Sequence, residues 1–70
     1  MTRITGVYSP HVYCVNYRRK DGHTFIFRYR YRGTLLRHMG QMIVSGCIEI
    51  ADAERVAELA MQLEWQTKGV

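Results

Sequence analysis

The stretch HVYCVNYRRKDGHTFIFRYRYR, residues 11–32, decides the fold of this 70-residue chain. Two runs within it, 11–18 and 24–32, alternate between ring-bearing or aliphatic side chains and polar ones. This period of two predicts β-strands, because successive side chains of a strand point to opposite faces. One face of the second strand would contain Phe25, Phe27, Tyr29 and Tyr31. The other face would contain Thr24, Ile26, Arg28, Arg30 and Arg32.

Between the two runs, Lys20-Asp21-Gly22 predicts a three-residue hairpin loop with Gly22 in the left-handed region. Such a loop places Arg19 opposite His23. The pairs that follow along the ladder are Tyr17–Phe25, Val15–Phe27 and Tyr13–Tyr29. In this register all the rings share one face, whereas a shift by one residue would mix rings with arginines.

Two helices are expected after the hairpin. The first would begin at the N-cap Thr34 and end before Gly46, and its apolar stripe is Leu35, Leu36, Met39, Met42 and Ile43. We expect Gly40 to allow the close approach of another element. The second would follow the N-cap Asp52 and end near Trp65, and its apolar stripe is Val56, Leu59, Ala60 and Leu63.

The predicted fold class is α+β: an antiparallel β-hairpin followed by two α-helices, ββα(β)α, with a possible short third strand at 47–50. We expect residues 1–10 to be a weakly ordered lead-in ending in a turn at Ser9-Pro10, and residues 11–67 to be a single domain. Residues 68–70 should fray.

The composition, with 47% hydrophobic and 23% charged residues, is that of a folded protein. Two cysteines, Cys14 and Cys47, are too few for a secreted disulfide scaffold. The first residues lack the apolar run of a signal peptide, and no segment reaches the ~20 apolar residues of a membrane span. We therefore expect a cytoplasmic protein with reduced thiols.

The residues that could support catalysis do not form a recognisable motif. The three histidines, His11, His23 and His38, are not part of a nucleophile arrangement, and the glycines do not form a phosphate-binding loop. His11 and Cys14 would point to opposite faces of a strand, which disfavours a shared metal. We expect a protein that is not an enzyme and that needs no metal or cofactor.

The charge is unevenly distributed. Residues 1–38 contain eight basic side chains and one acidic one, a net charge of +7, whereas residues 39–70 contain two basic and five acidic ones, a net charge of −3. The predicted binding residues are Arg18, Arg19, Lys20, Arg28, Arg30 and Arg32. Because arginine makes forked contacts with phosphates and guanine edges, they indicate a nucleic-acid-binding or regulatory protein. A merely solvated basic face and a site for an acidic protein surface are the alternatives.

A chain this short buries little of its apolar surface by itself, which favours a homodimer. The expected dimer or partner face is formed by Met39, Met42, Met61 and Trp65. A second functional hypothesis follows from this face: a small protein–protein interaction module, an inhibitor or adaptor, acting through a helix and the basic hairpin.

The segment Thr24–Trp65, a strand followed by two helices, resembles in architecture the ribbon-helix-helix repressors. In that family, paired strands of a dimer read the DNA major groove. The resemblance implies that Thr24–Arg32 is the reading strand and that Arg28 and Arg30 face the bases. This chain departs from the family in the strand that precedes the ribbon and in the longer turn at Cys47–Ala51.

Overall fold

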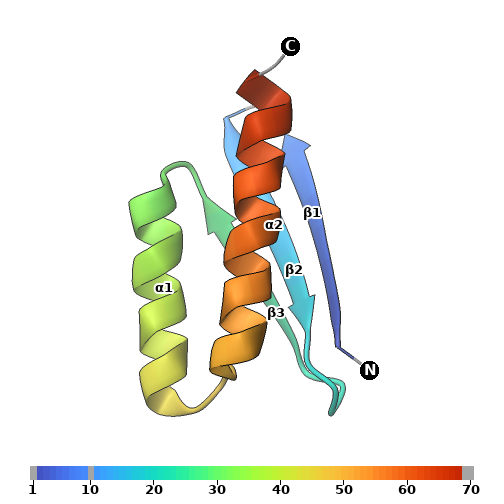
Figure 1. The fold of residues 1–70 in the computed structure, drawn as a ribbon, viewed down its shortest axis with the longest axis vertical. Coiled ribbons are helices and arrows are strands. Elements are labelled where there is room, and N and C mark those ends of the chain that lie inside the picture. Colours follow the sequence, from blue (N-terminus) through green and yellow to red (C-terminus); the bar gives the residue numbers. More distant parts are fainter. Residues whose placement is uncertain (1, 10, 69–70) are drawn as a thin grey trace.

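The computed structural model describes residues 2–9 and 11–68, and it shows three antiparallel strands followed by two helices (Figure 1). The elements are β1 (Arg3–Ser9), β2 (Val12–Arg18), β3 (Thr24–Tyr29), α1 (Arg32–Ser45) and α2 (Ile50–Lys68). The strands form one sheet in the order β1-β2-β3. The predicted α+β class is therefore confirmed.

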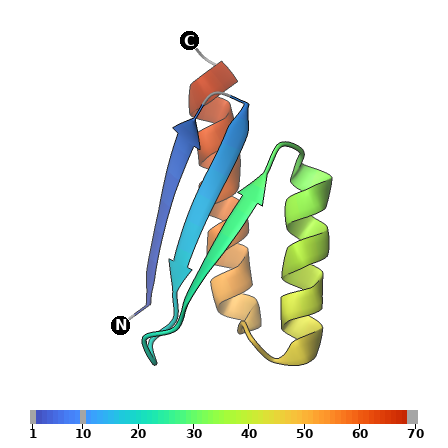
Figure 2. The same cartoon turned by 180° about the vertical axis from the view of Figure 1, so that it is seen from behind.

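Both helices lie on the same face of the sheet, so the described part of the chain forms two layers (Figures 1 and 2). Helix α2 packs against β1 and β2, and α1 packs against β3. Figure 2 shows the opposite face of the sheet, which no described helix covers. The sheet therefore has a buried face of rings and an open face.

The hairpin between β2 and β3 has the predicted register, with Tyr17 opposite Phe25 and Val15 opposite Phe27. In the loop, the Arg19 N–H donates to the His23 carbonyl at 2.7 Å, and the Gly22 N–H donates to the Arg19 carbonyl at 2.9 Å. Gly22 has a φ of 97°, in the left-handed region that glycine adopts without strain. The turn and the hydrophobic pattern thus specify the same pairing.

The core lies between the rings of β2 and β3 and the apolar stripes of the helices. Its largest fully buried side chains are Tyr17, Phe27, Leu35, Val15 and Val56. Helix α1 buries Leu35, Met39 and Met42. Leu36 and Ile43, expected on the same buried stripe, are instead 51% and 38% exposed, because the sheet is too narrow to cover the whole of α1.

The expectation that residues 1–10 form a weakly ordered lead-in is wrong, because Arg3–Ser9 pair with β2 along their whole length. The strand is difficult to predict from the sequence because Gly6 occupies a position on its buried face where strands usually have an apolar side chain. A Cβ at Gly6 would lie 3.3 Å from Leu63 Cδ2, so glycine lets α2 approach β1 closely. The close approach expected at Gly40 is absent from the described residues. Pro10 of the predicted Ser9-Pro10 turn lies outside them.

Residues 47–50 do not form the third strand. Gly46 caps α1 with a φ of 78°, and the Cys47 N–H closes the same helix end by donating to the Met42 carbonyl at 2.8 Å. Helix α2 then begins at Ile50, which leaves too few residues for a strand.

The other boundaries also differ from the predicted ones. Strand β3 ends at Tyr29, and α1 begins at Arg32 with Tyr31 as its N-cap, so Thr34 lies within the helix. Asp52 lies in the first turn of α2 and does not precede the helix. Helix α2 continues past Trp65 to Lys68, so the expectation of fraying is wrong for Lys68. Residues 69 and 70, also expected to fray, lie outside the described ones.

Two tyrosine hydroxyls of the buried layer have contrasting environments. The Tyr17 hydroxyl donates to Asp52 Oδ2 at 2.7 Å, and burial together with this carboxylate raises the pKa of Tyr17 to about 12. The Tyr29 hydroxyl is buried without a hydrogen-bond partner among the described residues, and burial raises the pKa of Tyr29 to about 12. The Tyr17–Asp52 bond joins the sheet to the start of α2.

These environments predict opposite effects of removing one oxygen atom. Tyr17→Phe should lower the free energy of unfolding by about 2 kcal/mol, because it deletes a hydrogen bond to a charged group. Tyr29→Phe should leave stability unchanged or raise it, because it removes a buried hydroxyl that has no partner. Urea denaturation followed by circular dichroism measures both, and equal losses in the two variants would contradict this assignment.

Candidate functional site

Four arginines lie on or beside the open face of the sheet, and all four are exposed. We call this set, Arg3, Arg18, Arg28 and Arg30, the basic face. Arg3 on β1 is directly opposite Arg18 on β2. Arg28 on β3 is opposite Cys14, and Arg30 follows immediately after the end of β3.

The positive charges of the basic face are not neutralised by carboxylates of residues 2–9 and 11–68. None of its four guanidinium groups forms an ion pair with a carboxylate of these residues. Like charges directly across a strand pair, as at Arg3 and Arg18, are destabilising. A bound anion would relieve this repulsion. The arrangement can therefore hold a ligand with several negative charges.

Arg19, one of the predicted binding residues, has a structural role. Its Nε lies 2.9 Å from both carboxylate oxygens of Asp21, and its Nη1 donates to the Cys47 carbonyl at 2.9 Å. Its guanidinium also lies 5.6 Å from the centre of the Phe25 ring. Arg19 thus ties the hairpin loop to the turn between α1 and α2.

The same contacts perturb the charged groups of the loop. Hydrogen bonds from Arg19, and then the bond from the His23 backbone N–H, hold the pKa of Asp21 well below its usual range. The bond to Asp21 raises the pKa of Arg19 above its ordinary value.

Two other predicted binding residues also have acidic neighbours. Lys20 lies 3.8 Å from Glu49, with both side chains largely exposed, so this pair is weak. The sequence predicted Arg32 on the strand, but it lies at the start of α1. Its Nε there lies 3.2 Å from Glu64 Oε2 on α2. Arg32 therefore joins the two helices and is not part of the basic face.

Sequence reasoning missed Arg3, because it did not recognise β1. Part of the signal was present in residues 3–6, where Arg3 and Thr5 face outward and Ile4 and Gly6 face the helices. Arg3, Arg18, Arg19 and Lys20 line a hollow of about 430 Å³ at the loop end of the sheet, together with Thr2 and Gly22.

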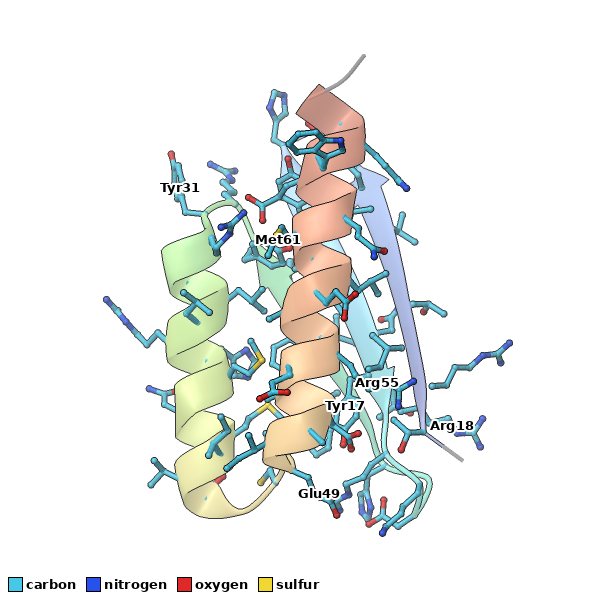
Figure 3. The ribbon with its side chains drawn as sticks, viewed as in Figure 1. Tyr17, Arg18, Tyr31, Glu49, Arg55 and Met61 are labelled. Atoms are coloured by element: carbon cyan, nitrogen blue, oxygen red, sulfur yellow. The ribbon has the colours of Figure 1, made fainter. Side chains whose placement is uncertain are left out.

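At the other end of the sheet, tyrosine rings lie beside the arginines. A hollow of about 520 Å³ is lined by Tyr8, His11, Tyr13, Arg30 and Tyr31. A second hollow, of about 400 Å³, is lined by Val12, Arg28, Tyr29, Arg30, Tyr31 and Thr34. Tyr31 is 74% exposed, and Figure 3 shows it at the opposite end of the molecule from Arg18. Rings and guanidinium groups are thus available together for stacking and for anion binding.

The expected dimer or partner face is divided between the core and the surface. Met39 and Met42 are buried core residues, so their assignment to a surface was wrong. Met61 and Trp65 lie on α2 and are 54% and 80% exposed. Of the four predicted residues, Met61 and Trp65 are therefore the ones exposed to another molecule.

The described residues contain no group of three or more histidine, cysteine or acidic side chains placed to hold a metal ion. Cys14 and Cys47, the two cysteines of the chain, are not joined by a disulfide. None of the described helices is long and apolar enough to cross a membrane.

Comparison with protein-family models, with curated proteins and with solved structures found no match to this chain.

The Arg19–Asp21 contact predicts a defined pH dependence of stability. Because the pKa of Asp21 is lowered in the folded state, its contribution is complete above the ordinary aspartate pKa of about 3.9 and is lost as the pH falls through the lower folded-state value. Asp21→Asn should therefore be less stable than the wild type at neutral pH, and the difference should shrink below pH ~4. Thermal unfolding across this pH range tests the effect, and a difference that is constant down to the most acidic pH would refute it.

Proposed function

We propose that this chain is a small non-enzymatic nucleic-acid-binding or regulatory protein whose basic face binds single-stranded DNA or RNA. The observation that supports the proposal most strongly is the set of four exposed arginines without carboxylate partners among the described residues. They lie on a sheet face that no described helix covers.

The arginines have the chemistry that a phosphate backbone requires. Each guanidinium is permanently charged and can donate two parallel hydrogen bonds to one phosphate. Arg28 and Arg30 are two residues apart, which corresponds to about 7 Å along an extended chain. Arg3 and Arg18 lie near the other end of the sheet, so a strand crossing the face would meet positive charge at both ends.

The tyrosines favour a single strand as the ligand. Proteins that bind single-stranded nucleic acid combine a positive surface with aromatic rings on which bases stack. Tyr31 is 74% exposed beside Arg30 and can stack on a base that is not paired. In a duplex the faces of the bases are already stacked on one another.

The arrangement of the strands disfavours the duplex reading implied by the ribbon-helix-helix architecture. A two-stranded ribbon enters the major groove, which is about 12 Å wide. Here β2 is the central strand of three, so β1 widens the ribbon on the side away from β3. The flat open face suits an extended single strand better than a groove.

A second candidate function is a small protein–protein interaction module, an inhibitor or adaptor. It is supported by exposed apolar side chains on the helices, notably Trp65 and Met61, which suit a protein partner. The basic face would then bind an acidic protein surface. The salt dependence of binding separates the two candidates, because release of counterions from phosphates is steeply salt-dependent.

Removing the arginines tests the proposal. Arg28→Ala and Arg30→Ala should each weaken binding of a fluorescent oligothymidine or oligouridine, and the double variant should weaken it further. If four phosphates are neutralised, the slope of log K against log salt should be about −3, and each substitution should reduce its magnitude by ~0.7. Fluorescence anisotropy at several salt concentrations measures both quantities.

Arg55→Ala is the matched control, because it removes the same charge from α2 on the helix side of the molecule (Figure 3). It should leave the affinity close to that of the wild type. Equal weakening by Arg55→Ala and Arg28→Ala would indicate attraction by net charge alone. No retention of the wild type on heparin and no oligonucleotide binding at low salt would exclude the proposed function.

The stacking role of Tyr31 predicts a different signature. Tyr31→Ala should weaken binding of the same oligonucleotides by about 1–3 kcal/mol without changing the salt slope, because it removes a ring and no charge. Tyr31→Phe keeps the ring and should bind like the wild type. A loss of affinity in Tyr31→Phe as large as that in Tyr31→Ala would show that the hydroxyl, and not stacking, is responsible.

A further inference from the structure

The helix layer exposes apolar side chains on the surface that faces away from the sheet. We call this surface the outer helix face, and its most exposed apolar residues are Val44, Ile50, Met61 and Trp65. Val44 is 89% exposed and Trp65 80%. Large apolar residues concentrated on one face mark a site of contact with another molecule.

The Arg32–Glu64 ion pair fixes the heights of residues on the two antiparallel helices relative to each other (Figure 1). With a rise of 1.5 Å per residue, Arg37 lies about 7.5 Å from the level of this pair and Glu58 about 9 Å from it, in the same direction. These two exposed side chains therefore stand at nearly the same height, one on each helix. By the same reasoning Val44 is level with the first turn of α2, and Trp65 is level with the start of α1.

The helices have opposite charges. Helix α1 contains Arg32 and Arg37 and no acidic residue, a net charge of +2. Helix α2 contains four acidic and two basic residues, a net charge of −2. A surface with one positive and one negative helix side by side is complementary to itself when one copy is rotated onto the other.

We propose that the outer helix face binds a second copy of this chain about a twofold axis. The axis lies in the interface between the two copies, parallel to the helices and midway between α1 and α2. This axis lays α1 of one copy over α2 of the other at the same height. Arg37 then meets Glu58 of the partner subunit, Val44 meets the partner subunit's Ile50, and Trp65 meets the start of the partner subunit's α1. A twofold axis in the same plane but across the helices would place α1 against α1, bringing like charges together.

The size of the face agrees with this occupant. The molecule measures 36 × 23 × 17 Å, and the helices cover one of its two broadest sides (Figure 1). A face of 36 × 23 Å matches the ~800 Å² that each partner contributes to a standard interface. An isologous contact of this kind is the commonest way in which identical subunits associate. The open faces of the two sheets remain on the outside, so this dimer does not depend on the proposed function.

Sedimentation equilibrium of the full chain tests the proposal. The wild type should show twice the chain mass of 8.2 kDa at micromolar concentration and should dissociate on dilution. Trp65 is the single tryptophan, and its emission should shift to the red as the dimer dissociates and the ring becomes exposed to water. A single-chain mass at all concentrations overturns the proposal. So does a dimer whose tryptophan emission is independent of dilution, because it would use another surface, such as the free edge of β3.

Charge exchange tests the orientation of the two copies. Arg37→Glu and Glu58→Arg, each alone, should weaken self-association by at least tenfold, because each places like charges together at two symmetry-related positions. The double variant R37E/E58R, and an equimolar mixture of the two single variants, should associate like the wild type. Circular dichroism controls for folding. Two single variants that dimerise as tightly as the wild type, or a double variant that stays monomeric, overturn this geometry.

Discussion

The register of the β2–β3 hairpin is the constraint on which the rest of the structure depends. Pairing Val15 with Phe27 and Tyr17 with Phe25 places every ring of these strands on one face, and the helices can then bury that face. A slip by one residue would expose the rings and bury arginines, at a cost of several kcal/mol for each unpaired charge. The Lys20-Asp21-Gly22 loop, together with the contacts of Arg19 to Asp21 and His23, fixes the same register at the loop end of the hairpin.

This register also separates the basic residues into two groups. Some arginines form contacts within the chain that stabilise the fold. Arg19 binds Asp21 and the Cys47 carbonyl, and Arg32 binds Glu64. Arginines of the basic face have no carboxylate partner within the described residues, as at Arg18 and Arg28. Charge counts alone do not distinguish the groups, although only the second is available to a ligand.

The two proposed contact surfaces lie on opposite sides of a thin molecule. The outer helix face has exposed apolar residues and complementary charges, whereas the basic face is positive. In the proposed dimer the helices are buried at the centre and the two sheets face outward, so each copy keeps its arginines accessible. Burial of Trp65 and Val44 against a second copy would add apolar contacts that a 70-residue domain lacks on its own.

The sequence alone determined the hairpin and its register, the glycine of the loop, the existence of both helices and the α+β class. These features are local, because period-two and helical patterns depend on neighbouring residues. The strand β1 was not predicted from the sequence, because its buried face includes Gly6, which interrupts the apolar pattern where a Cβ would lie 3.3 Å from Leu63 Cδ2. The prediction was also wrong for Arg32, Met39 and Met42, whose environments depend on how α1 packs against α2 and β3. Which arginines form the basic face was decided only by tertiary structure, because the ion pairs and hydrogen bonds of Arg19 and Arg32 join residues as far apart as 32 positions in the chain.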